Sequence, residues 1–120
     1  IGSTVEDFFN YNTSDLIAFY FFDQVLIDNQ QIDTNDWVVA FNENICVGAK
    51  QWDCTSSSCD LAVYGYNSLN SLTDGYMLSG ELPSFKIYDT SNAILYDATP
   101  SSNIVWQDGS FNQIEILNAE

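Results

Sequence analysis

The chain has 120 residues, 46% of them hydrophobic, and its 3 Trp, 7 Tyr and 8 Phe supply enough apolar surface for the core of one domain. Seventeen acidic residues against two lysines give a formal net charge of -15, which makes nucleic acid and anionic membranes poor partners. The chain contains no histidine and no arginine, so it lacks the usual general base and the usual groups that stabilise an oxyanion. We therefore expect no enzyme.

Residues 1–14 carry scattered apolar side chains without a sustained period, so we interpret them as an extension of a domain that spans residues 15–120. Asn12 begins the glycosylation sequon Asn-Thr-Ser, which is used only on a glycosylating secretory route. The chain shows no charged n-region followed by an apolar h-region and no apolar span of about 18 residues. We expect a mature or excised segment without membrane insertion.

Residues 16–27, LIAFYFFDQVLI, predict a strand that is apolar on both faces and ends at the Asp28-Asn29 pair. Asp28, Asp33 and Asp36 crowd the loop that follows and offer hard oxygen ligands, so we predict calcium as the one candidate cofactor. Their spacing is not that of an EF-hand, and turns are also rich in Asp. The alternative is that these residues only form the loop.

The longest apolar run, residues 36–53, predicts a hairpin with the turn at Asn42, Glu43 and Asn44. Such a turn sets three pairs on one face, which we expect to be the core face: Phe41 with Ile45, Val39 with Val47, and Trp37 with Ala49. The opposite face carries Val38, Ala40, Cys46 and Gly48, and it is too apolar to lie bare in water. Another part of the chain must therefore cover some of it.

Cys54 and Cys59 flank four small polar residues and predict a short-range disulfide in an oxidising compartment. Cys46, within the apolar hairpin, is expected to be a buried free thiol. A zinc site would lack its fourth ligand, because the chain has no histidine.

The second half of the chain reads as further short strands between turns rich in Asn, Asp, Ser and Gly, and no segment has a helical period. The expected strands are residues 61–66, 85–88, 93–96, 104–106 and 111–117, with residues 76–81 left ambiguous. This pattern predicts an all-β fold, an antiparallel β-sandwich of about eight or nine strands, Ig-like or jelly-roll-like.

Several runs, in the same order, resemble a largely uncharacterised module of secreted and cell-surface multidomain proteins of marine bacteria and algae. They are FYFF at 19–22, DWVVAFNENICVGAKQWD at 36–53, CD at 59–60, GYMLSGELPSFKIYD at 75–89 and YDATPSSNIVW at 96–106. The resemblance covers most of residues 15–120 and implies a β-sandwich and an extracellular or cell-surface location. Members of the module have glycine in the hairpin turn where this chain has Glu43, which leaves the turn type open.

We expect a non-catalytic structural or adhesive module that self-assembles head to tail, with the N-terminal extension lying against the next copy. The residues expected at this contact are Val5, Phe8, Phe9 and Tyr11. An extension packed on its own domain is the alternative, and the net charge opposes assembly unless salt or cations screen it. A second candidate function is binding of polysaccharide by exposed rings. The candidate rings are Trp37, Trp52, Trp106, Tyr64, Tyr66 and Tyr76.

Overall fold

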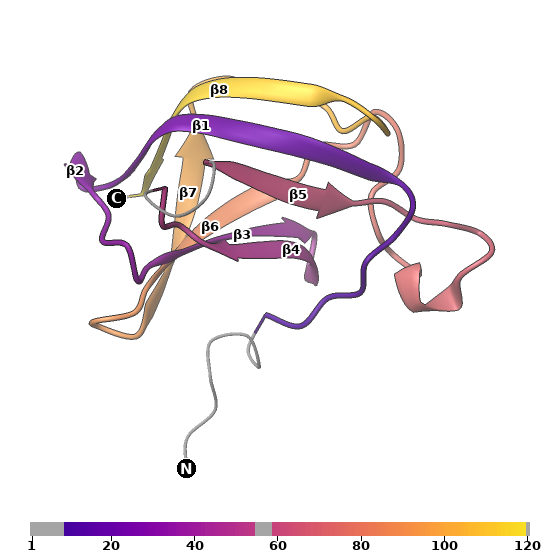
Figure 1. Ribbon diagram of the computed structural model, residues 1–120, viewed down its shortest axis with the longest axis horizontal. Helices are drawn as coiled ribbons and strands as arrows, with labels where there is room; N and C mark the ends of the chain where they lie inside the picture. Colours follow the sequence, from indigo (N-terminus) through magenta and orange to yellow (C-terminus); the bar gives the residue numbers. More distant parts are fainter. Residues whose placement is uncertain (1–8, 55–58, 120) are drawn as a thin grey trace, which may run out of the picture.

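The structure, a computed structural model, describes residues 9–54 and 59–119 (Figure 1). It contains eight strands: β1 Ile17–Ile27, β2 Gln30–Gln31, β3 Trp37–Asn42, β4 Ile45–Gln51, β5 Asp60–Tyr64, β6 Ser84–Asp89, β7 Ile94–Pro100 and β8 Phe111–Ala119. A short 3-10 helix, η1, spans Ser71–Thr73. Within the described ranges, no helix is long and apolar enough to cross a membrane. The all-β prediction is confirmed.

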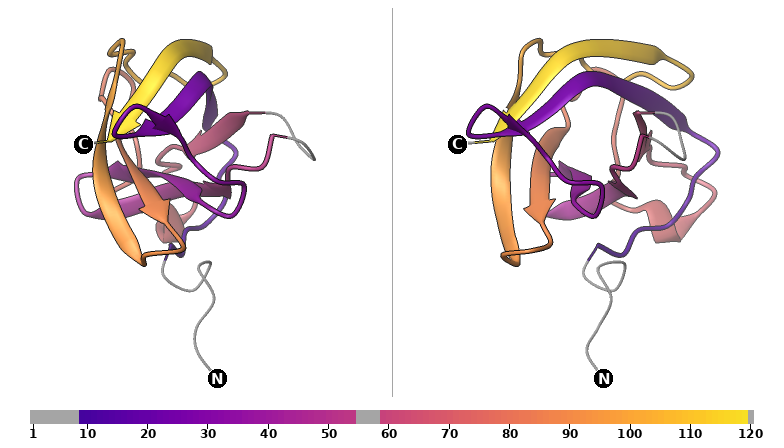
Figure 2. Two further views of the ribbon diagram at one scale, coloured as in Figure 1. Left: turned by 90° about the vertical axis from the view of Figure 1, so that its left-hand side faces the viewer. Right: turned by 60° about the vertical axis from the view of Figure 1, so that its left-hand side comes forward.

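The strands form one strongly curled sheet and not the two facing sheets of the predicted sandwich (Figure 2). Their order is β2-β1-β8-β7-β6-β3-β4, and β5 pairs with β1 on the same side as β2. All pairs are antiparallel except β1 with β8, which is parallel. Alternating side chains look the same in a curled sheet and in a sandwich, so the sequence pattern did not separate the two architectures.

The two outer strands of the curl, β4 and β5, approach each other closely at Gly48. A Cβ atom added at Gly48 would collide with the carbonyl oxygen of Ala62 in β5. Only glycine lets the two backbones come this near, because every other residue carries that carbon. The Lys50 ammonium of β4 lies 3.2 Å from the Asp60 carboxylate of β5 and forms a second link across the same seam. The curl is therefore nearly closed, as a half-barrel around its core.

The main core fills the inside of the curl and joins every long strand. Its fully buried side chains include Tyr20, Phe22, Leu61, Ile87, Trp106, Ile114 and Leu117. In β1 and β8 the alternation of buried and exposed residues shifts by one between Phe22 and Val25 and between Ile114 and Leu117. Because both neighbours shift at the same level, the two strands bend together and still cover one core.

The β3–β4 hairpin is present, but its predicted register and its predicted core face are wrong. Its loop has two residues, with Asn42 opposite Ile45, and a bulge between Ala40 and Phe41 then sets Val39 opposite Ala49. Glu43 takes the left-handed conformation that such a tight turn requires, with φ of 56°. The main core receives Val38, Ala40 and Val47. The side that carries Trp37, Val39 and Phe41 faces outward instead.

Residues 104–106, a predicted strand, form a loop whose backbone bonds to another loop. The Trp106 N–H donates to the carbonyl of Glu81 at 2.7 Å, and the Gly80 N–H donates to the carbonyl of Trp106 at 3.0 Å. The Trp106 indole is buried and donates to the carbonyl of Val63 at 2.9 Å. The next turn, at Asp108 and Gly109, therefore leads into β8 without forming a hairpin, and the Gly109 N–H donates to the carbonyl of Ile17 at the start of β1.

The turn between β6 and β7 holds Ala93 at φ of 55°, in the left-handed region where an L-residue with a Cβ is strained. Ala93→Gly removes that strain on an exposed turn, so we expect it to raise the free energy of unfolding by about 0.5–1 kcal/mol. Urea unfolding measures the change. Ala98→Gly is the matched control, because Ala98 lies within β7 and its replacement should lower stability by a similar amount. Equal losses in both variants would contradict the strained conformation.

Candidate functional site

The outward face of β3 and β4 is covered by residues 9–11, which we call the N-terminal strap. Phe9, 7% exposed, packs on Trp37 and Val39 of β3. Its ring meets Tyr88 of β6 edge to face, with centroids 5.6 Å apart and planes at 73°. The expectation that both faces of the hairpin are covered is therefore confirmed, and Phe9 supplies the cover.

Tyr11 and Asn12 fasten the other end of the strap. The Tyr11 ring stacks on Tyr64 of β5 at 5.7 Å between centroids, and its hydroxyl donates to the Ala49 carbonyl at 3.4 Å. The Asn12 N–H donates to the Tyr76 hydroxyl at 2.7 Å. Burial raises the pKa of Tyr11 above its ordinary value of 10.0, and the neighbouring Tyr64 adds to the shift. The strap is thus tied to β4, β5 and the loop after β5.

The predicted inter-subunit and glycosylation residues can now be placed. Val5 and Phe8 lie outside the described residues, whereas Phe9 and Tyr11 lie on the protein's own sheet. Asn12 is exposed, and its side-chain amide donates to the carbonyl of Leu72 at 3.3 Å. A glycan on Asn12 would therefore stand in solvent at the end of the strap.

Beside the strap lies an open hollow of about 380 Å³, lined by Phe9, Asn10, Tyr11, Trp37, Ala49, Lys50 and Gln51. These residues supply rings, amides and one ammonium group. The ammonium of Lys50 is already paired with Asp60. An arrangement of this kind can hold a side chain or a small polar group by packing and hydrogen bonding.

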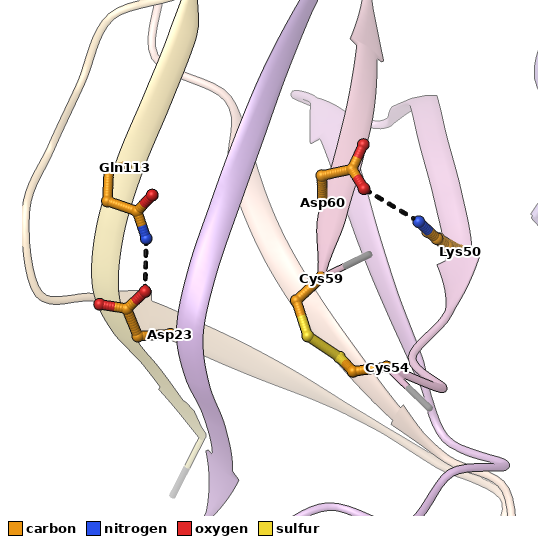
Figure 3. The surroundings of a disulfide bond; sticks show 6 residues. All are labelled: Asp23, Lys50, Cys54, Cys59, Asp60 and Gln113. Atoms are coloured by element: carbon orange, nitrogen blue, oxygen red, sulfur yellow. Dashed lines mark hydrogen bonds and ion pairs between the residues drawn. A yellow bond between two sulfur atoms is a disulfide. The ribbon is translucent and has the colours of Figure 1, made fainter. Parts of the chain in front are cut away.

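The disulfide Cys54–Cys59 is present, as predicted, with its Cα atoms 5.3 Å apart (Figure 3). Together with the neighbouring Lys50–Asp60 ion pair, it links the chain after β4 to the start of β5. Cys46 is a free, half-buried cysteine, and its thiol lies 3.7 Å from the carbonyl of Gly48. Burial raises the pKa of the Cys46 thiol, which makes it a poor nucleophile near neutral pH.

The acidic residues proposed as calcium ligands border one open hollow but do not converge on a metal position. Within the described part of the chain, no three His, Cys, Asp or Glu side chains form a group that could hold a metal ion. Asp36 is 3% exposed, and its two carboxylate oxygens accept from the backbone N–H groups of Thr90 and Asp33 at 3.0 and 2.9 Å. Asp28 lies exposed in the β1–β2 turn, with φ of 50°. The observed role of Asp36 is to join two loops.

Most of the rings proposed for sugar stacking are inside the protein. Trp37, Trp52, Trp106 and Tyr76 are buried, and Tyr64 lies against Tyr11. The most exposed ring among the described residues is Phe111, at 74%. The sequence contained a signal for it, because Phe111 shares its strand phase with Glu115 and not with the buried Ile114.

Replacing both Cys54 and Cys59 by serine should lower the free energy of unfolding by about 2 kcal/mol, because the unfolded chain regains the entropy of the open loop. Urea unfolding of the oxidised protein and the double variant measures the loss. Cys46→Ser is the control and should leave the mass shift on reduction unchanged. A peptide map that links Cys46 to either partner would show that the pairing is wrong.

Because the folded state holds Tyr11 neutral with a raised pKa, the stability from this group is present below pH 10.0, its ordinary pKa, and is lost as the pH rises above it. Tyr11→Phe has no ionisable phenol, so it should lose less stability than the wild type between about pH 8 and about pH 11. Urea unfolding at both pH values tests this. Equal losses in the two proteins would place the sensitive group elsewhere.

Comparison with known proteins identifies no relative of this chain. No protein-family model, no curated protein and no solved structure matches the chain. The resemblance to secreted marine modules therefore stays a prediction. The features of this chain that can carry a function are the strap, the hollow beside it and the surface of the half-barrel.

Proposed function

We propose that this chain is a non-catalytic building block of an extracellular assembly, in which the N-terminal strap of one copy lies on the outer face of β3 and β4 of the next. The observation that carries the proposal is the position of Phe9. This residue belongs to the segment that precedes the first strand, and its ring is buried on the side of β3 that faces away from the main core. The disulfide favours an oxidising compartment.

A strap of this kind can change partners at low cost. The groove that receives Phe9 is built from Trp37, Val39 and Tyr88, which belong to strands β3 and β6 of the sheet and not to the strap. Residues 13–15 connect the strap to β1 and are largely exposed. Exchange between copies replaces each contact by an identical one, which is the principle of domain swapping. When each copy passes its strap to a further copy and does not exchange straps reciprocally with one partner, the contact is head to tail and repetition produces a chain of copies.

The net charge of -15 opposes such an assembly, so neighbours must meet where carboxylates are sparse. Residues 61–73 contain no charged residue, and Leu69 and Leu72 in this stretch are 94% and 64% exposed. This surface borders the connection, since the Asn12 side chain donates to the Leu72 carbonyl. A neighbour that accepts the strap would therefore approach the uncharged end of the molecule.

Two variants separate donation of the strap from its acceptance. Deletion of residues 1–11 leaves a copy that can only accept, whereas Ala49→Glu puts a charge into the groove and leaves a copy that can only donate. Each variant alone should stay monomeric at high salt, where the wild type should form chains that lengthen with concentration. An equal mixture of the variants should stop at a pair. Light scattering after size separation measures all three states.

Phe111→Ser is the control, because Phe111 is exposed and lies on β8, outside the groove. It should assemble like the wild type. Chains that persist after deletion of residues 1–11 would show a different interface. A wild type that stays monomeric at every salt and protein concentration would show that the strap packs only within its own copy.

A further inference from the structure

A second unexplained surface lies on β1 and β8, at the top of the view in Figure 1, whereas the strap lies below the half-barrel. The side chains of Phe19 and Phe21 in β1 and of Phe111 in β8 project from the face opposite the core. The parallel register sets Phe19 directly opposite Phe111, and their rings stack with centroids 5.5 Å apart and planes at 9°. Phe21 is 6.2 Å from Phe111, tilted by 36°.

This aromatic stack is costly for a monomer and has no role in the core. Phe111 is 74% exposed, whereas Ile114 and Leu117, which face inward on the same strand, are 1% and 0% exposed. Partly exposed rings that lie together, as these three do, mark a candidate contact surface for a partner. The question is therefore which chemistry fits the surroundings of the rings.

Two carboxylates lie at one end of the stack, four residues along the strands from Phe19 and Phe111. They belong to Asp23 and Glu115, which are exposed where the alternation of buried and exposed residues shifts in β1 and β8, and the Gln113 amide donates to the Asp23 carboxylate (Figure 3). On the other side of β1, Asp60 of β5 lies opposite Phe21 in the register and is paired with Lys50. Each lysine of the chain is paired with another carboxylate, Lys50 with Asp60 and Lys86 with Asp97. The stack thus has Asp23 and Glu115 at one end, on a chain with a formal net charge of -15.

We propose that this surface is a docking site for a basic segment of a partner protein, which places one arginine or lysine side chain over Phe111 and a second one, about 13 Å further along the strands, next to Asp23 and Glu115. A cation above an aromatic face is attracted by the negative face of the ring, and the two carboxylates attract the second cation. The net charge of -15 steers such a segment toward the protein. The protein already makes one contact of this kind, because the Lys86 ammonium lies 5.1 Å from the centroid of the Phe41 ring.

The same charges disfavour the other occupants. A second copy of this chain would bring further carboxylates against Asp23 and Glu115, and an anionic polymer would meet the same repulsion. A neutral sugar carries no positive charge that the Asp23 and Glu115 carboxylates could attract. The site is also independent of the strap, so it stands whether or not the copies exchange their N-termini.

An oligoarginine peptide, titrated into the labelled full chain and followed by the backbone N–H resonances in NMR, tests the proposal. The shifts should concentrate on residues 19–23 and 111–115. Phe111→Leu keeps an apolar side chain without the ring face and should weaken binding roughly three-fold. Asp23→Asn keeps the shape and removes one charge, so it should weaken binding by a similar factor and reduce the salt dependence.

Asp74→Asn is the matched control, because it removes one exposed carboxylate from the loop after η1. It should bind the peptide like the wild type. If Asp74→Asn and Asp23→Asn weaken peptide binding equally, the peptide is attracted only by the net charge of the protein, and the proposal is overturned. Unchanged binding by Phe111→Leu would overturn it as well. So would a neutral glucan oligosaccharide that shifts these residues while the peptide does not.

Discussion

The fold depends on how its curled sheet closes where β4 meets β5. β4 and β5 are not paired as neighbouring strands, and three short-range features hold them together: the missing side chain of Gly48, the Lys50–Asp60 ion pair and the Cys54–Cys59 disulfide. Closure at this seam keeps Leu61 and Val63 of β5 against the same core as Val47 of β4. Without it, one side of the main core would open to water.

The curl of the sheet explains why the strap is needed. A sheet that surrounds one core has only one face inside it, yet β3 is apolar at every position from Trp37 to Phe41. The inner positions fill the core, and the outer ones need a separate cover. Phe9 provides it with one aromatic ring, and burial of a ring contributes a gross of about 4–6 kcal/mol at about 25 cal/mol per Å². The strap is therefore part of the folded domain, even though it is not a strand of the sheet.

Charge distinguishes the exposed apolar surfaces from one another. The stretch of residues 61–73 has no charge, so a like-charged copy can approach it, whereas the phenylalanine stack on β1 and β8 is bordered by Asp23 and Glu115. One surface tolerates a second copy, and the other attracts a cation. The two proposals rest on this difference and use opposite sides of the half-barrel.

The sequence by itself determined most of the strands, the disulfide pair and the need to cover both faces of the β3–β4 hairpin, because these follow from local alternation and short spacing. The predicted strand at residues 104–106 is wrong, and the short β2 was not predicted. Only the tertiary structure decided the parallel pairing of β1 with β8, the seat of Phe9 and the stack of Phe19 on Phe111. These contacts join residues far apart in the chain, and strand alternation carries no information about which distant strand becomes the neighbour. The hairpin register failed for a related reason, since one bulged residue exchanges the two faces of a strand.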